Sequence, residues 1–200
     1  MMSETATSAP TSHEAEILAG LGKRLIVLVG MMGAGKSTIG RRLAARLNLP
    51  FVDADTEIET AAGATIEEIF QRHGETAFRE GERRVMVRLL DNPPHVLATG
   101  GGAFMDPSTR TLIRERAVSV WLRADLELML ARVARRNNRP LLKAGDPRTV
   151  LERLIAERYP VYGEAEIAVD SVDGPPEATV DQVMAALAAH VAAGQEQSAT

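Results

Sequence analysis

The segment Gly30–Ser37 has the residue types and spacing of a phosphate-binding loop. Its sequence, GMMGAGKS, fits the pattern G-x-x-x-x-G-K-[ST]. The apolar run at 25–29 precedes it as a predicted buried strand. The residues after it carry an apolar stripe at helical spacing: Ile39, Leu43 and Leu47. In that setting backbone N–H groups turn towards a polyphosphate, Lys36 reaches its outer phosphates and the Ser37 hydroxyl ligates magnesium. The motif predicts a nucleoside triphosphate site and leaves the chemistry open.

Two carboxylates follow the next predicted strand, at 51–52. Asp53 and Asp55 are two residues apart, so in extended backbone their side chains point to the same side. Asp53 suits the coordination sphere of magnesium, and Asp55 suits a group that orients or deprotonates an attacking hydroxyl. A turn or a helix N-cap also favours aspartate. Beside a phosphate loop we favour the functional interpretation.

Arg79 and Glu82 lie three residues apart on a predicted helix and so share one face. Either the carboxylate holds the guanidinium towards a ligand, or the two form an exposed ion pair. The run Gly100–Gly102 follows a strand and offers bare backbone amides to a ligand. Alternatively, this run forms a flexible turn. Because ordering three glycines costs conformational entropy, we favour a functional role for them.

A basic cluster lies around a polar loop: Arg132, Arg135, Arg136, Arg139 and Lys143. Such charges suit a mobile lid at about 135–146 that closes on a phosphoryl group, or else a solvated face or an RNA patch. Arg158 ends a predicted helix, where either ligand binding or the helix dipole explains a cation. Spacing alone does not decide between these two roles of Arg158.

The predicted elements alternate along the chain. Strands are expected at 25–29, 51–52, 95–99, 117–122 and 167–170. Helices are expected at 13–22, 38–47, 56–62, 65–73, 75–90, 107–116, 125–136, 147–158 and 179–193. This alternation predicts an α/β fold, with a parallel sheet between two layers of helices. The loop, the aspartates and the glycines then meet at the carboxyl ends of strands, where such folds bind ligands.

The composition of the chain argues against several kinds of site and several classes of protein. The 200 residues suit one domain and include no cysteine, so disulfides and thiolate metal sites are excluded. The net charge of −4 and the few aromatics, one Trp, two Tyr and four Phe, argue against nucleic-acid binding. No apolar run is long enough to span a membrane, and the start of the chain has no basic signal region. We expect a cytoplasmic protein with a disordered extension at 1–20, one domain at 21–194 and a flexible tail at 195–200.

Taken together, these motifs resemble the bacterial shikimate kinases. The resemblance rests on the phosphate loop, Asp53–Asp55, Ala77–Arg79 with Glu82, the triple glycine, Arg139-Pro140-Leu141-Leu142 and Glu157-Arg158-Tyr159, in the family's order and at similar spacing. It extends from about Leu25 to about Ala193. It implies a P-loop NTPase fold of the nucleoside monophosphate kinase type, with five parallel strands in the order 2-3-1-4-5. The implied reaction transfers the γ-phosphoryl group of ATP, with Mg²⁺, to the 3-hydroxyl of shikimate.

The resemblance also implies a role for each matched residue. ATP contacts come from Gly33, Ala34, Gly35, Lys36, Ser37, Thr38 and the lid residue Arg139. Shikimate contacts come from Asp55, Arg79, Gly101, Gly102 and Arg158, and Glu82 holds Arg79. Asp55 is the implied catalytic base, with Lys36 and Arg139 also catalytic, and Ser37 and Asp53 hold the metal. A monomer is the family's usual state.

Some alternatives remain open. A second lid arginine is not assigned among Arg132, Arg135 and Arg136, and the adenine loop is placed only near 171–175. Another kinase of this fold, such as a gluconate kinase, is the nearest rival function. A nucleoside monophosphate kinase would need a base-binding region, and a GTPase an Asn-Lys-x-Asp motif; the sequence shows neither. A catalytically idle nucleotide-binding regulator would fit the loss of Lys36, Asp53 or Asp55, all of which are present.

Overall fold

The computed structural model describes residues 12–134 and 146–198. In chain order, its elements are α1 (Ser12–Leu21), β1 (Leu25–Val29), α2 (Lys36–Arg46), β2 (Phe51–Asp53), α3 (Ala54–Ala62), α4 (Ile66–Leu90), β3 (Val96–Ala98), the 3₁₀ turn η1 (Ala103–Met105), α5 (Pro107–Arg116), β4 (Ala117–Arg123), α6 (Leu126–Ala134), α7 (Pro147–Tyr162), β5 (Ile167–Asp170) and α8 (Pro176–Ser198).

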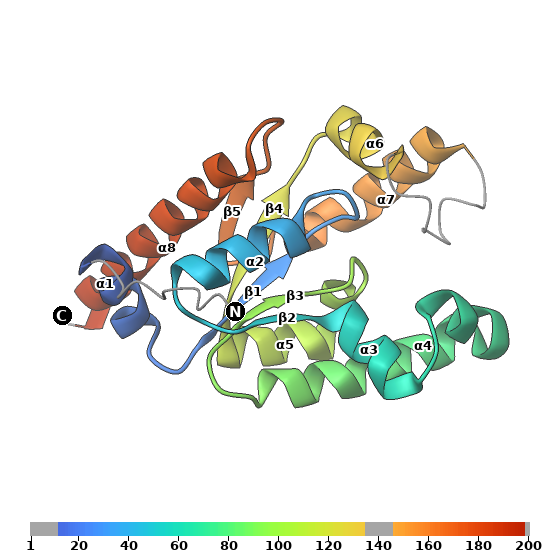
Figure 1. Cartoon of the computed structure of the whole chain (residues 1–200), viewed down its shortest axis with the longest axis horizontal. Helices are drawn as coiled ribbons and strands as arrows, with labels where there is room; N and C mark the ends of the chain where they lie inside the picture. The colour runs from blue at the N-terminus through green and yellow to red at the C-terminus, as the bar shows by residue number, and fades with distance from the viewer. Residues whose placement is uncertain (1–11, 135–145, 199–200) are drawn as a thin grey trace, which may run out of the picture.

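The five strands form one parallel sheet in the order β2-β3-β1-β4-β5, which confirms the predicted order and fold class. β1 is the central strand, and all five of its residues are buried because helices cover both faces of the sheet. Figure 1 shows α2 and α8 on one side of the sheet and α4 and α5 on the other. This arrangement is the predicted three-layer α/β/α architecture.

The sheet brings the predicted motifs to one end. The phosphate loop follows β1, Asp55 begins the helix after β2, and the three glycines follow β3. Since β2, β3 and β1 are neighbours and parallel, their carboxyl ends lie side by side. The fold therefore assembles one polar edge from three separate stretches of sequence.

Local signals in the sequence set several helix ends. Thr65 and Glu68 form a capping box at the start of α4. Asp106 caps α5, with Pro107 at its first position. α4 is broken at Gly74, whose φ of 76° is not helical, as the predicted stop at 73–74 required. The segment after this break carries Arg79 and Glu82.

The two ends of the described chain differ from the predictions. The helix expected at 13–22 is present as α1, which begins inside the stretch 1–20 that was expected to be a disordered extension. Ile17 and Leu21 of this helix are buried against the rest of the fold. Figure 1 places α1 beside α8, and the two helices pack together. α8 continues to Ser198, so the tail predicted at 195–200 is helical over most of its length. α8 thus extends beyond the predicted 179–193 at both ends, and it packs on α2 and β5 as well as on α1.

α7 also runs further than predicted, to Tyr162 rather than to Arg158. Pro160 lies inside it. Proline supplies no N–H to the preceding turn, yet the helix continues, because Leu151, Leu154 and Tyr162 bury its apolar face. Among the described helices, none is both long and apolar enough to cross a membrane.

Candidate active site

The phosphate loop is wrapped around the side chain of Lys36. Its Nζ donates hydrogen bonds to the carbonyl oxygens of Gly30, at 2.8 Å, and Met31, at 3.0 Å. Gly33 and Gly35 have φ values of 81° and 97°, a region that residues with a β-carbon avoid. Gly35 directly precedes the first turn of α2. The loop therefore presents a cation and a helix N-terminus together, as a polyphosphate site requires.

Asp53 makes two hydrogen bonds, which match the two roles considered from the sequence: a partner of the phosphate loop and a helix N-cap. Its Oδ2 accepts a 2.6 Å hydrogen bond from Ser37 Oγ, and its Oδ1 accepts one of 3.1 Å from the backbone N–H of Asp55. The residue is thus both the N-cap of α3 and a neighbour of the phosphate loop. A hydroxyl and one carboxylate suit Mg²⁺, which takes oxygen ligands and fills its remaining positions with water and phosphate oxygens. Elsewhere in the described chain no group of three or more acidic, His or Cys side chains is placed to hold a metal.

A cavity of about 350 Å³ opens beside this loop. Its walls come from the loop and α2, from the ends of β2 and β3, from α6 and from the segment before α8. The lining residues are Gly33, Gly35, Lys36, Ser37, Thr38, Ile39, Asp53, Asp55, Thr99, Gly101, Leu128, Ala131, Arg132, Val133, Asp173, Gly174, Pro176 and Thr179. The cavity therefore joins the predicted metal and acceptor residues to the region predicted to hold adenine.

Arg132 ties together the two walls of the cavity that are furthest apart in sequence. Its Nη1 donates to the carbonyl of Gly33 at 3.2 Å and to Ser171 Oγ at 2.8 Å, and its Nη2 donates to the carbonyl of Val172 at 2.8 Å. Of the three arginines considered for the lid, Arg132 is the one in the described chain. There it fixes the phosphate loop against the 171–172 segment.

The carboxylates of Asp55 and Glu82 converge on Gly100. A β-carbon built there would lie 2.7 Å from Asp55 Oδ1 and 3.0 Å from Glu82 Oε1. At Gly102 a β-carbon would lie 2.6 Å from Cζ of Arg79. A side chain at the first or third glycine of the turn would therefore displace a charged side chain that approaches the bare backbone.

Arg79 is held by two carboxylates of α4. Its Nη1 donates to Glu82 Oε2 at 2.7 Å and its Nη2 to Glu75 Oε1 at 3.2 Å. Burial raises the pKa of Glu82, the charge of Arg79 opposes this rise, and the charge of Asp55 adds to it. Burial lowers the pKa of Arg79, but its pairing with Glu82 and Glu75 together outweighs this and leaves that pKa raised. The predicted Arg79–Glu82 pair is thus a largely buried one, since Glu82 is only 4% exposed.

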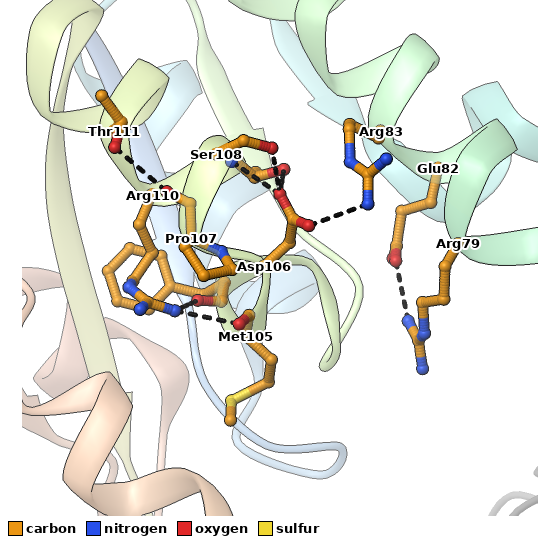
Figure 2. Close-up of polar contacts among 11 residues, drawn as sticks. Arg79, Glu82, Arg83, Met105, Asp106, Pro107, Ser108, Arg110 and Thr111 are labelled. Atoms are coloured by element: carbon orange, nitrogen blue, oxygen red, sulfur yellow. Dashed lines mark hydrogen bonds and ion pairs between the residues drawn. The ribbon is translucent and has the colours of Figure 1, made fainter. Parts of the chain in front are cut away.

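A second ion pair connects α4 to the segment after the glycines. Arg83 Nη2 donates to Asp106 Oδ2 at 2.9 Å. Figure 2 shows Arg83 reaching from α4 to Asp106, beside the Arg79–Glu82 pair. Asp106 also caps α5, and although burial opposes it, hydrogen bonds from Ser108, Thr109 and Arg83 lower its pKa. These contacts anchor the helix that carries Arg79.

Arg158 and Tyr162 come from successive turns of α7 and meet at one atom. Arg158 Nη1 donates to the carbonyl oxygen of Gly101 at 2.9 Å, and the Tyr162 hydroxyl donates to the same oxygen. Both side chains are buried. Burial raises the pKa of Tyr162 to about 12, against the opposing effect of Arg158, so the phenol is a donor at neutral pH.

The structure brings most of the predicted residues to one edge of the sheet. Arg139 and the predicted lid, apart from Asp146, lie outside the described residues. Tyr162 lies at this edge and had no assigned role in the sequence. Arg132 was one of three candidate lid arginines, and Gly100 was considered only as part of the glycine run. Tyr162 carries a usable signal, because it lies four residues after Arg158 and so shares its helix face.

A parallel sheet with a Lys- and Ser-bearing loop after its central strand, and a cavity beside that loop, defines the class: a P-loop kinase. The model of one family, described as Shikimate kinase, matches residues 32–188. The chain therefore belongs to the shikimate kinase family, and its activity is that of a shikimate kinase in the shikimate pathway.

Individual relatives agree with this assignment. The chain is 58% identical over 193 residues to a shikimate kinase of Rhodopseudomonas palustris, covering 96% of this chain and 95% of that one. It is 62% identical over 173 residues to one of Paramagnetospirillum magneticum, covering 86% and 89%. The structure matches the shikimate kinase of Acinetobacter baumannii in complex with shikimate, with a TM-score of 0.80, 39% identity and coverage of 84% and 94%. A gluconokinase of Sinorhizobium meliloti, at 21% identity, 88% and 98% coverage and a TM-score of 0.56, shows a shared fold alone.

Proposed function

We propose that the chain transfers the γ-phosphoryl group of ATP to the 3-hydroxyl of shikimate, giving shikimate 3-phosphate and ADP. The proposal rests on one observation: three charged side chains converge on the turn at Gly100–Gly102. Arg79 reaches it at Gly102 and Arg158 at Gly101, while Asp55 reaches it at Gly100. Two cations and one carboxylate thus approach one turn, and Gly101 of that turn lines the cavity beside the phosphate loop. That set fits a small acceptor with one carboxylate and several hydroxyls.

Each acceptor residue then has a distinct task. Arg79 and Arg158 bind the acceptor carboxylate, for which a guanidinium offers paired donors, and the backbone at 101–102 contacts the ring. Glu82 holds Arg79 in place. Asp55 lines the same cavity as Lys36 and Ser37, so it is positioned to orient the attacking hydroxyl and accept its proton. Positioning of this kind is most of what phosphoryl transfer requires from a protein.

The nucleotide residues divide into phosphate and metal contacts. The backbone and side chains of residues 33–38 bind the phosphates, with Lys36 moving from the loop carbonyls to the β- and γ-phosphates. Ser37 and Asp53 would hold Mg²⁺, which would neutralise the charge of the phosphates. Arg139 adds a further cation from the lid. Adenine lies against Arg132 and the residues near 173–176, which line the far side of the cavity.

A monomer is the proposed active form, as is usual in the family that the sequence resembles. The net charge of −4 supports the proposal that nucleic acid is not a ligand. Analytical ultracentrifugation with and without substrates tests the oligomeric state. A dimer that forms only with both substrates would contradict it.

The experiment that tests the acceptor is a coupled assay of ADP release with ATP and Mg²⁺. Shikimate, gluconate, quinate and AMP are compared with a reaction that lacks an acceptor. The proposal expects release that depends on shikimate, and a phosphorus spectrum of the product that identifies the phosphorylated hydroxyl. Equal release with gluconate would contradict the proposed acceptor specificity. Phosphate at a hydroxyl other than the third would contradict the proposed chemistry.

A further inference from the structure

A second and larger hollow lies between α3 and α4. Its volume is about 580 Å³, and it shares no lining residue with the cavity at the phosphate loop. Small residues create it, because alanine and glycine occupy positions where larger side chains would fill the space between the helices: Ala61, Ala62, Ala64, Ala77 and Gly81. A β-carbon built on Gly81 would meet no atom within 4 Å. The hollow has the size of sites that hold small organic molecules.

The lining of this α3–α4 hollow is apolar with a basic rim. Its larger apolar side chains are Ile58, Ile69, Phe78 and Val85. Every charged side chain in the lining is an arginine: Arg72, Arg84 and Arg88. His73 adds a further polar ring, and no aspartate or glutamate takes part. The chemistry of the lining therefore complements a molecule with an apolar body and a negative group.

The three arginines differ in how far their charge is already compensated. Arg72 pairs with Glu68 at 3.3 Å and Arg88 with Glu57 at 2.9 Å. Both of these pairs are solvent-exposed, and such pairs are weak. Arg84 is exposed and makes no ion pair or hydrogen bond with any residue in the described ranges. Arg84 is therefore the cation most available to an incoming anion.

The hollow shares its walls with the acceptor site. On α4, Phe78 and Gly81 line the hollow, while the adjacent Arg79 and Glu82 face the glycine turn. On α3, Ile58 lines the hollow one turn after Asp55. A molecule wedged between the two helices would fix the spacing between Asp55 and Arg79. Those two side chains have to contact one acceptor molecule at the same time.

We propose that the α3–α4 hollow binds a small aromatic carboxylate or similar apolar anion, and that its occupancy changes the affinity for the acceptor. The coupling part rests on the acceptor roles proposed above for Asp55 and Arg79. The binding part does not, because it depends only on the lining of the hollow. The two parts are therefore tested by separate measurements.

Binding is tested by fluorescence titration of the full chain with anilinonaphthalene sulfonate, at saturating ATP so that the nucleotide cavity is blocked. Uncharged phenylnaphthylamine serves as the matched probe without the anion. We expect saturation at one site and tighter binding of the sulfonate. Equal affinity for the two probes, or loss of the signal with ATP, would overturn the proposed site.

Two variants locate the probe. Gly81→Leu fills the hollow with a side chain that a helix accepts easily, and its sulfonate binding is expected to vanish. Arg84→Gln is expected to weaken binding about fivefold, the upper range for a partly exposed charge pair. Arg153→Gln, an exposed arginine on α7 outside the hollow, is the control. Circular dichroism checks that each variant is folded. Unchanged binding in both Gly81→Leu and Arg84→Gln would overturn the assignment.

Coupling is tested by the KM for shikimate at increasing sulfonate concentration. We expect that KM to change at least about threefold while kcat changes little, because the probe acts on acceptor binding. The change should disappear in Gly81→Leu. Probe binding with a constant KM would overturn the coupling and leave the site in place. An enzyme inactive on shikimate would refute the proposed function, and the titration would still decide the binding.

Discussion

The guanidinium of Arg79 lies against the backbone of Gly102, so closely that a β-carbon at position 102 would be 2.7 Å from Nη2. Gly102 has φ of −101°, a value open to any residue. Glycine is needed there for space and not for backbone conformation. Arg79, the cation proposed to bind the acceptor, is thus hydrogen-bonded to Glu82 on one side and lies against a backbone without a side chain on the other.

Gly102→Ala should therefore displace Arg79 without unfolding the turn. We expect the KM for shikimate to rise about 10- to 100-fold, the range for losing one well-formed charged hydrogen bond, and the KM for ATP to stay the same. Gly194→Ala, at an open position of α8, is the control. Steady-state kinetics at varied shikimate measures the KM of both variants. A normal shikimate KM in Gly102→Ala would refute the steric argument.

Tyr162→Phe removes one of the two donors to the Gly101 carbonyl while keeping the ring in the core. We expect the KM for shikimate to rise about threefold to tenfold with kcat nearly constant, since one hydrogen bond contributes about 0.5–1.5 kcal/mol. Tyr159→Phe is a matched control, because the Tyr159 hydroxyl donates to the carbonyl of Ala124 instead. If both variants have the same KM, Tyr162 has only a packing role.

The raised pKa of Glu82 predicts a pH dependence of acceptor binding. As the pH falls through that raised pKa, protonated Glu82 no longer holds Arg79 by charge, so the KM for shikimate should increase. Glu82→Gln should show a high KM at every pH and lose this step. Glu75→Gln removes the more exposed partner of Arg79, and this variant should keep the increase of KM at low pH.

The raised pKa of Glu82 also affects the free energy of unfolding, and the direction of this effect can be worked out. Because burial raises the folded-state pKa of Glu82, the folded protein binds this proton more tightly than the unfolded chain. Glu82 alone therefore makes the free energy of unfolding fall as the pH rises from the ordinary carboxyl pKa to the raised one. Urea titrations at several pH values measure this, and a rise across that window that Glu82→Gln abolishes would contradict the sign.

Asp53→Asn separates the metal role of Asp53 from its capping role. Asparagine still accepts the hydrogen bond from the Asp55 N–H, so the start of α3 should be intact. We expect the Mg²⁺ concentration for half-maximal rate to rise about tenfold or more, and chelation of Mg²⁺ to abolish the wild-type reaction. Asp106→Asn, at the cap of α5, is the control. A Mg²⁺ requirement unchanged from the wild type would exclude Asp53 from the metal site.

Ile17→Ala tests whether α1 is part of the folded domain. Ile17 is 1% exposed, so the variant should lose about 2–4 kcal/mol of unfolding free energy. Glu16→Ala, on the exposed side of the same helix, should lose much less. Equal urea midpoints for the two variants would mean that α1 is not docked in solution.

The sequence predicted those parts of the site that depend on local pattern. The phosphate loop, the capping box at Thr65 and the cap at Asp106 are each encoded within a few residues, and the structure shows them. The alternation of strands and helices was enough for the parallel sheet. The strand order came from the resemblance to a known family.

Contacts between distant segments were not predictable in the same way. Arg132 reaches Gly33 and Val172, and Tyr162 reaches Gly101, only because the strand order brings their elements together. Gly100 was read with its neighbours as a ligand-binding turn, although its closest contacts are two carboxylates of the protein.

The pairing of α1 with α8 has a consequence for biosynthesis. α1 leaves the ribosome before any strand of the sheet, and its packing partner is made only after β5. Until then Ile17 and Leu21 have no apolar surface on α8 to cover, so this part of the domain closes late in translation. The nascent chain is therefore exposed to proteolysis at its first helix until α8 has been made.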